Sequence, residues 1–91
     1  MKITKIQIIK TTSPKVLARA DVGFEDITVK GFKVLKDQVT GKDFVTPPSY
    51  YTPGGWRPLF KTTTKELWQE LCAAIIKAYN QHLIEESLNE K

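Results

Sequence analysis

The sequence predicts an α+β domain: a twisted antiparallel sheet of four to five strands, with one long C-terminal helix packed on it. Two observations lead to this prediction. Residues 2–46 consist of short segments that are rich in β-branched residues or alternate between apolar and polar residues. From Thr63 onward the apolar residues recur at the spacing of an α-helix. A chain of 91 residues has room for one hydrophobic core. We therefore treat residues 1–91 as a single domain, made of a basic sheet with an aromatic loop (1–61) and a helix (62–91).

Four segments are typical of strands. Residues 2–10 are rich in isoleucine with interleaved lysines, and residues 16–24 alternate between an apolar and a mostly polar face. Such alternation is typical of a half-buried antiparallel strand, and the small alanines on its apolar face favour a helix packed against it. Two further strands are expected at residues 27–36 and 43–46.

The strand at residues 27–36 changes phase at a glycine. Ile27 and Val29 are apolar at odd positions, whereas Phe32 and Val34 are apolar at even positions. A shift of one residue turns every following side chain to the other face of the sheet. We therefore predict a β-bulge at Gly31.

The segment Pro47–Pro58 is predicted to be an ordered loop and not a strand, because its four prolines remove hydrogen-bond donors. Its aromatic rings leave two interpretations open: they stack on unpaired bases, or they pack within the protein or against a dimer partner. For Trp56 we favour packing against the edge of the sheet. For Tyr50 and Tyr51 neither interpretation is favoured, since adjacent residues of an extended loop cannot easily both be buried.

The C-terminal segment is predicted to be an amphipathic helix. Thr63–Glu66 fits the capping box, in which a threonine and a glutamate satisfy each other's free backbone N–H groups. An apolar stripe follows, widened by flanking residues into a face broad enough to cover a sheet. Its members are Leu67, Leu71, Ile75, Ala78 and His82, flanked by Trp68, Cys72, Tyr79 and Leu83.

The sequence contains no recognisable catalytic or metal-binding constellation. Cys72 is the only cysteine and lies in the helical apolar pattern, where a free cysteine usually acts as a small buried hydrophobe. His82 is the only histidine and has no second ligand at metal-binding spacing. We expect neither an enzyme nor a cofactor, metal ion or small-molecule substrate. The absence of a long apolar run leads us to expect a cytoplasmic protein without a membrane segment.

The positive charge lies in the first two thirds of the chain. Residues 1–61 contain eleven Lys or Arg against five acids, a net +6, whereas residues 62–91 carry a net −2. A basic surface attracts polyanions such as nucleic acids. A lysine-rich surface that is merely solvated is the other interpretation.

Five segments occur in a particular order: Met1–Ile8 (MKITKIQI), Leu17–Val22 (LARADV), Val29–Leu35 (VKGFKVL), Phe44–Ser49 (FVTPPS) and Thr52–Arg57 (TPGGWR). Their order and spacing resemble the stage V sporulation protein G (SpoVG) family, over nearly the whole chain. The resemblance implies an antiparallel sheet with a C-terminal helix, assembled as a homodimer through its strands. It also implies a bacterial regulatory protein that binds DNA, and in some members RNA, linked to sporulation, septation and gene expression.

The sequence departs from the family pattern after Ser49. Family members usually have a basic pair there, and this chain has Tyr50 and Tyr51. The loop is also about one residue shorter, and an acid common before its aromatic residue is missing. Arg57 matches the family's basic residue after that aromatic, and Lys65 lies near the position of one that opens the helix. Two stacking rings in place of two phosphate-binding charges argue against ordinary duplex binding, and favour either single-stranded nucleic acid or a divergent partner.

The leading hypothesis is therefore a non-catalytic, dimeric nucleic-acid-binding regulator. The alternative is a protein–protein interaction module that uses the aromatic loop or an open strand edge. The residues predicted to contact nucleic acid are Lys30, Lys33, Tyr50, Tyr51, Arg57, Lys61 and Lys65.

Overall fold

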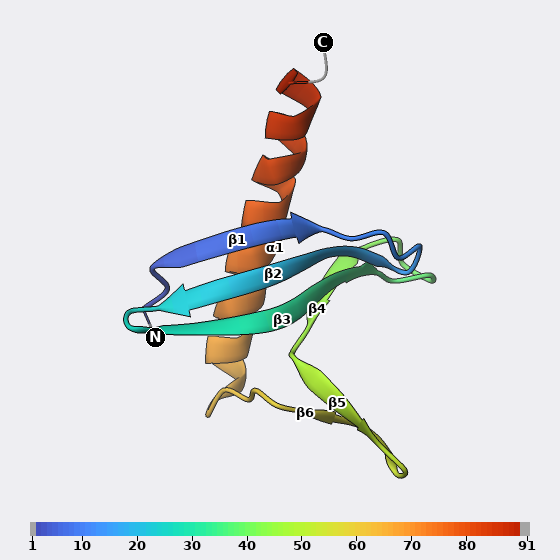
Figure 1. Ribbon diagram of the computed structural model, residues 1–91, viewed down its shortest axis with the longest axis vertical. Coiled ribbons are helices and arrows are strands. Elements are labelled where there is room, and N and C mark those ends of the chain that lie inside the picture. Colours follow the sequence, from blue (N-terminus) through green and yellow to red (C-terminus); the bar gives the residue numbers. More distant parts are fainter. Residues whose placement is uncertain (1, 90–91) are drawn as a thin grey trace.

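The computed structural model describes residues 2–89 and confirms the α+β architecture. Strands β1 to β4 form one antiparallel sheet in chain order, and β5 and β6 form a separate two-stranded sheet that extends away from it (Figure 1). The elements are β1 (Lys5–Lys10), β2 (Val16–Phe24), β3 (Ile27–Lys36), β4 (Asp43–Thr46), β5 (Ser49–Thr52), β6 (Gly55–Pro58) and α1 (Lys65–Asn89).

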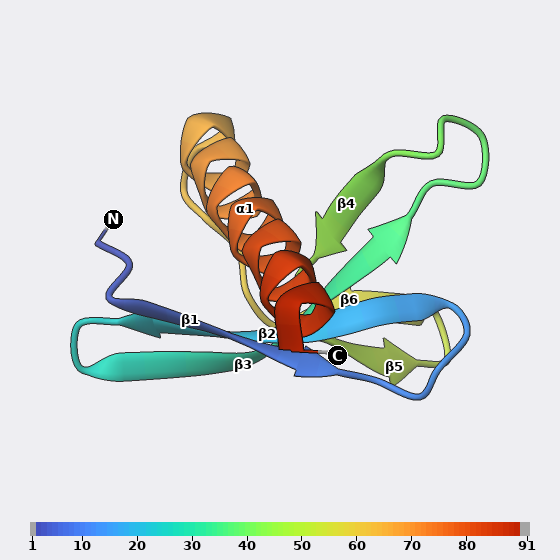
Figure 2. The same ribbon diagram turned by 90° about the horizontal axis from the view of Figure 1, so that it is seen from above.

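The helix α1 packs on one face of the four-stranded sheet. It crosses the strands in Figure 1, and Figure 2 shows it on a single side of the sheet, the side toward which β4 rises. The small side chains of Ala18 and Ala20 on β2 are buried in the same core as the helix residues Leu71 and Ile75, as the alternation of this strand predicts. The buried apolar residues are Ala18, Ala20, Val22, Phe32, Val34, Val45, Leu71, Ile75 and Tyr79.

The predicted bulge in β3 is confirmed. The pairing of β2 with β3 moves from Ala20 opposite Phe32 to Val22 opposite Val29, so β3 contains one extra residue. Gly31 has a φ of 102°, a conformation that glycine adopts readily and other residues rarely. The extra residue brings Val29 and Phe32 to the same face of the sheet.

A buried carboxylate holds this bulge. Asp21, which is only 7% exposed, accepts a hydrogen bond of 3.3 Å from the Gly31 amide. Its Oδ1 also lies 3.4 Å from Nε of Arg19. The alternation places Asp21 on the polar face of β2, but its burial is a finding of the structure. A Cβ on Gly31 would lie 3.5 Å from Cβ of Pro48, so the bulge also packs against the chain that leads into β5.

The prediction of a loop for Pro47–Pro58 is wrong, because β5 and β6 form a β-hairpin here. Tyr50 pairs with Arg57 and Tyr51 pairs with Trp56. The prolines do not prevent this pairing, because they occupy edges and the turn, where a missing N–H disrupts no ladder. Two precede β5, one lies in the turn and one ends β6: Pro47, Pro48, Pro53 and Pro58.

The prediction of a capping box at Thr63–Glu66 is wrong, because the helix is capped one residue later. Thr64 caps α1, because its Oγ1 accepts a hydrogen bond of 3.2 Å from the Leu67 amide. Lys65 is therefore the first helical residue, and Leu67 occupies the third position, where a capping box requires Glu or Gln. Glu66 has the right spacing for a box that starts at Thr63, but it lies one position too early for the actual cap at Thr64.

The apolar face of α1 covers the sheet only along its first part. Leu71, Ile75 and Tyr79 are buried, whereas Leu83 is exposed, contrary to the expectation that it widens the buried face. The reason is visible in Figure 1, where the C-terminal part of α1 extends past the sheet. Burial raises the pKa of the Tyr79 hydroxyl, and the nearby carboxylates of Asp43 and Glu86 raise it further.

We predict that Gly31→Ala lowers the free energy of unfolding by about 1–3 kcal/mol, because a residue with Cβ is strained at this φ. The matched control is Gly54→Ala in the hairpin, where φ is not positive and the closest atoms to a new Cβ are ordinary contacts at 3.7 Å and 3.8 Å. This control is expected to change stability by about 0.5 kcal/mol or less. Urea unfolding measures the stability of both variants. Equal stability would contradict the strain that the positive φ of Gly31 is expected to cause.

A second prediction concerns the start of the helix. Thr64→Ala removes the cap and is expected to destabilise the protein by about 1 kcal/mol. Thr63→Ala should have little effect, since Thr63 is not the capping residue. Thermal unfolding followed by circular dichroism compares the two variants. A larger loss of stability for Thr63→Ala than for Thr64→Ala would show that Thr63 is the capping residue, as the sequence predicts.

Candidate nucleic-acid interface

One face of the β5–β6 hairpin carries two exposed aromatic rings, and a lysine of β3 lies beside them. Tyr51 and Trp56 are 69% and 65% exposed, and their ring centroids lie 5.5 Å apart in an edge-to-face arrangement at 74°. Nζ of Lys33, from β3, lies 5.7 Å from the centroid of the Trp56 ring. The expectation that Trp56 packs against the sheet edge is thus wrong. In the hairpin register its side chain pairs with Tyr51 and lies largely in solvent.

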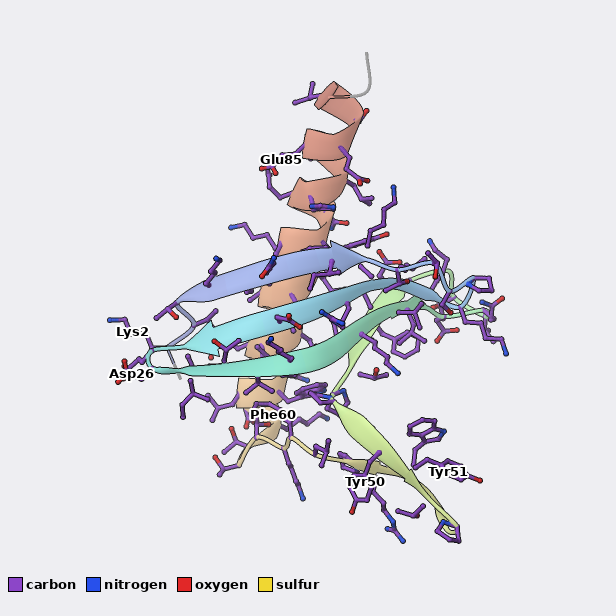
Figure 3. All side chains as sticks on the ribbon, in the orientation of Figure 1. Lys2, Asp26, Tyr50, Tyr51, Phe60 and Glu85 are labelled. Carbon is purple, nitrogen blue, oxygen red and sulfur yellow. The ribbon has the colours of Figure 1, made fainter. Side chains whose placement is uncertain are left out.

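The opposite face of the hairpin carries a second aromatic–cation pair. Tyr50 and Arg57 are direct cross-strand neighbours, and Tyr50 is 46% exposed. Adjacent residues of a strand point to opposite faces, so Tyr50 and Tyr51 present their rings on different sides. Figure 3 shows both tyrosines on the hairpin, well away from the four-stranded sheet. The hairpin therefore offers a ring and a cation on each face.

The lysine beside Trp56 belongs to a wider basic surface on the sheet. Lys33 pairs directly with Arg19 of β2, and both are exposed on the face of the sheet opposite the helix. Arg19 was not among the predicted contact residues. The alternation of residues 16–24 does assign it to the polar face, but the cross-strand register that sets it beside Lys33 is a property of the folded sheet.

The remaining predicted residues divide into two groups. Lys61 and Lys65 both line a pocket between the base of the hairpin and the first turn of α1. Lys30 is exposed in the bulge next to Gly31 and belongs to none of these groups. The predicted residues thus form three groups. Lys33 and Tyr51 both lie next to the Trp56 ring, Tyr50 is paired with Arg57, and Lys61 and Lys65 line the same pocket.

Within residues 2–89, no three His, Cys, Asp or Glu side chains are grouped as a metal site requires. Burial raises the pKa of the Cys72 thiol, which disfavours the reactive thiolate. Nε2 of His82 lies 3.6 Å from Oε2 of Glu86, one turn along the same helix. None of the helical segments among these residues has the length and apolar character needed to cross a membrane.

We compared the sequence with models of known protein families and with curated proteins. No family model matches it, and no curated protein is significantly similar to it.

The exposure of Trp56 yields a prediction. The second tryptophan, Trp68, is half-buried with its ring stacked on Phe32 at 6.4 Å, so Trp56 should account for most of the fluorescence that acrylamide quenches. We expect Trp56→Phe to lower the Stern–Volmer constant severalfold, and Tyr50→Phe to leave it unchanged. A constant that Trp56→Phe does not alter would place the Trp56 ring inside the protein.

Proposed function

We propose that the chain is a non-catalytic nucleic-acid-binding regulatory protein that prefers single strands. The observation that carries this proposal is the β5–β6 hairpin, where Tyr50, Tyr51 and Trp56 are exposed and cations lie beside them. Proteins that bind single strands without strict sequence preference combine such rings with basic side chains. The rings stack on bases while the cations contact the backbone.

The energies of the two kinds of contact support this division of roles. Stacking of one base on an aromatic side chain contributes about 1–3 kcal/mol and requires a base face that is not already stacked in a duplex. Phosphate contacts from Arg57 and Lys33 are independent of sequence and weaken as salt rises. The net +6 of residues 1–61 adds long-range attraction for a polyanion.

The resemblance to the SpoVG family supplies the biological part of the proposal. It suggests a cytoplasmic regulator of gene expression connected with sporulation and septation, acting as a homodimer. Tyrosines at the place of the family's basic pair support single-stranded DNA or RNA as the ligand in preference to duplex DNA. Sedimentation of the purified protein measures its oligomeric state.

The test is a fluorescence-anisotropy titration against single-stranded DNA, RNA and duplex DNA at two salt concentrations. We expect the tightest binding to a single strand. Plotting the logarithm of the binding constant against the logarithm of the salt concentration gives a slope. Arg57→Gln should reduce the magnitude of this slope by about 1, the effect of losing one phosphate contact. Tyr51→Leu should weaken binding by about 1–3 kcal/mol. Lys77→Gln on α1 is the matched charge control and should change neither quantity.

Failure to bind any nucleic acid at low salt, by a protein shown to be folded, would contradict the proposal. If Arg57→Gln leaves the salt dependence unchanged, Arg57 does not contact the nucleic-acid backbone.

A protein–protein interaction module is the second candidate, and a groove between β4 and α1 favours it. This groove has a volume of about 690 Å³, and the exposed side chains of Phe44 and Ile84 line it. Retention of a partner from lysate after nuclease treatment, lost in Phe44→Ser but not in Tyr51→Leu, would support this function.

A further inference from the structure

We propose that the pocket between the base of the hairpin and the start of α1 binds one unpaired nucleobase together with its phosphate. This inference rests on the proposed function and assigns to it a specific site. The hairpin rings offer exposed stacking surfaces, whereas this pocket offers a concave position lined by several elements.

The pocket has the size of a small-ligand site. Its volume is about 610 Å³, within the range of roughly 300–1,000 Å³ that is typical of such sites. Its walls come from the end of β4, the end of β6, the connection to α1 and the first turn of the helix. The lining residues that the argument uses are Pro47, Pro58, Phe60, Lys61, Lys65 and Trp68.

One side of the pocket is formed by rings that the core holds in place. Phe60 packs edge-to-face on Phe32, with centroids 5.1 Å apart, and Trp68 stacks on Phe32 at 6.4 Å and 30°. Phe32 is fully buried, so both rings rest on a fixed support. Figure 3 shows Phe60 between the sheet and the segment that leads from the hairpin to α1. Flat apolar walls that are already positioned suit a planar base, because little entropy is lost on binding.

The lining of the pocket also includes two cations. Lys61 and Lys65 both line it and are both exposed. Lys65 is also the first residue of α1, where the helix dipole adds partial positive charge. Glu66, the acid of the first helical turn, is not among the lining residues. An apolar slot beside two cations matches a base joined to a phosphate.

The position of the pocket fits a continuous strand of nucleic acid. Pro58 lines the pocket and directly follows Arg57, which stands beside Tyr50 on the hairpin. A strand with one base in the pocket can therefore place a neighbouring nucleotide on the hairpin. Bases within a duplex are stacked and paired, so the pocket would select for unpaired nucleotides.

The test uses Trp68 as a reporter in a Trp56→Phe protein, where it is the only tryptophan. A short oligothymidine should quench Trp68 fluorescence saturably, because a base enters next to the indole ring. An oligonucleotide of the same length with abasic sites throughout should not quench it. Lys61→Gln in this background should raise the concentration for half-maximal quenching severalfold, whereas Lys77→Gln should leave it unchanged.

Anisotropy of the same labelled oligothymidine, measured on the same protein, separates the possible failures. Binding without quenching, or equal quenching by the abasic oligonucleotide, would overturn the pocket and leave the proposed function standing. Absence of binding by both the Trp56→Phe protein and the unaltered protein would overturn both.

Discussion

The hydrogen bond from the Gly31 amide to the buried Asp21 carboxylate is the constraint on which the rest of the structure depends. A buried carboxylate is costly unless it is paired, and here Arg19 and the bulge amide are its partners. The bulge turns Phe32 toward the helix, where it supports the core. It also leaves room for Pro48 against Gly31, which fixes where the hairpin leaves the sheet. One polar contact thus sets both the phase of β3 and the position of the candidate interface.

Two groups of aromatic rings follow from this arrangement, and they serve different purposes. The first group surrounds Phe32, where Phe60 and Trp68 are partly buried and contribute to folding. The second group lies on the hairpin, where the rings of Tyr51 and Trp56 remain mostly in water. Rings left in solvent gain little from folding, so stability does not account for them. Clustered exposed apolar surface of this kind is typical of interaction sites.

Much of the sheet could be predicted because its signals are local. The alternation in residues 16–24 and the phase change at Gly31 are read directly from neighbouring residues. The hairpin could not be predicted in the same way, because prolines argue against strands unless the pairing pattern leaves them outside the ladder. The candidate contact residues could be named from the sequence, but their grouping could not, because it depends on which residues face each other across paired strands. Only the cross-strand register shows that Tyr51 adjoins Trp56, and that Arg19 adjoins Lys33.

The contact of Lys33 with the Trp56 ring links the hairpin to the four-stranded sheet. A two-stranded hairpin is marginally stable alone in water, and here the bond from the Leu59 amide to the Pro48 carbonyl, at 2.7 Å, secures its base. The cation–π contact of Lys33 adds about 0.5–1 kcal/mol at an exposed site. Stacking of a base contributes about 1–3 kcal/mol. Under the proposed function, stacking of a base would therefore outweigh the contact between Lys33 and the indole ring. The displaced Lys33 side chain would then lie close to the phosphate of the bound nucleotide, so the same cation would contact the ring in the free protein and the phosphate in the complex.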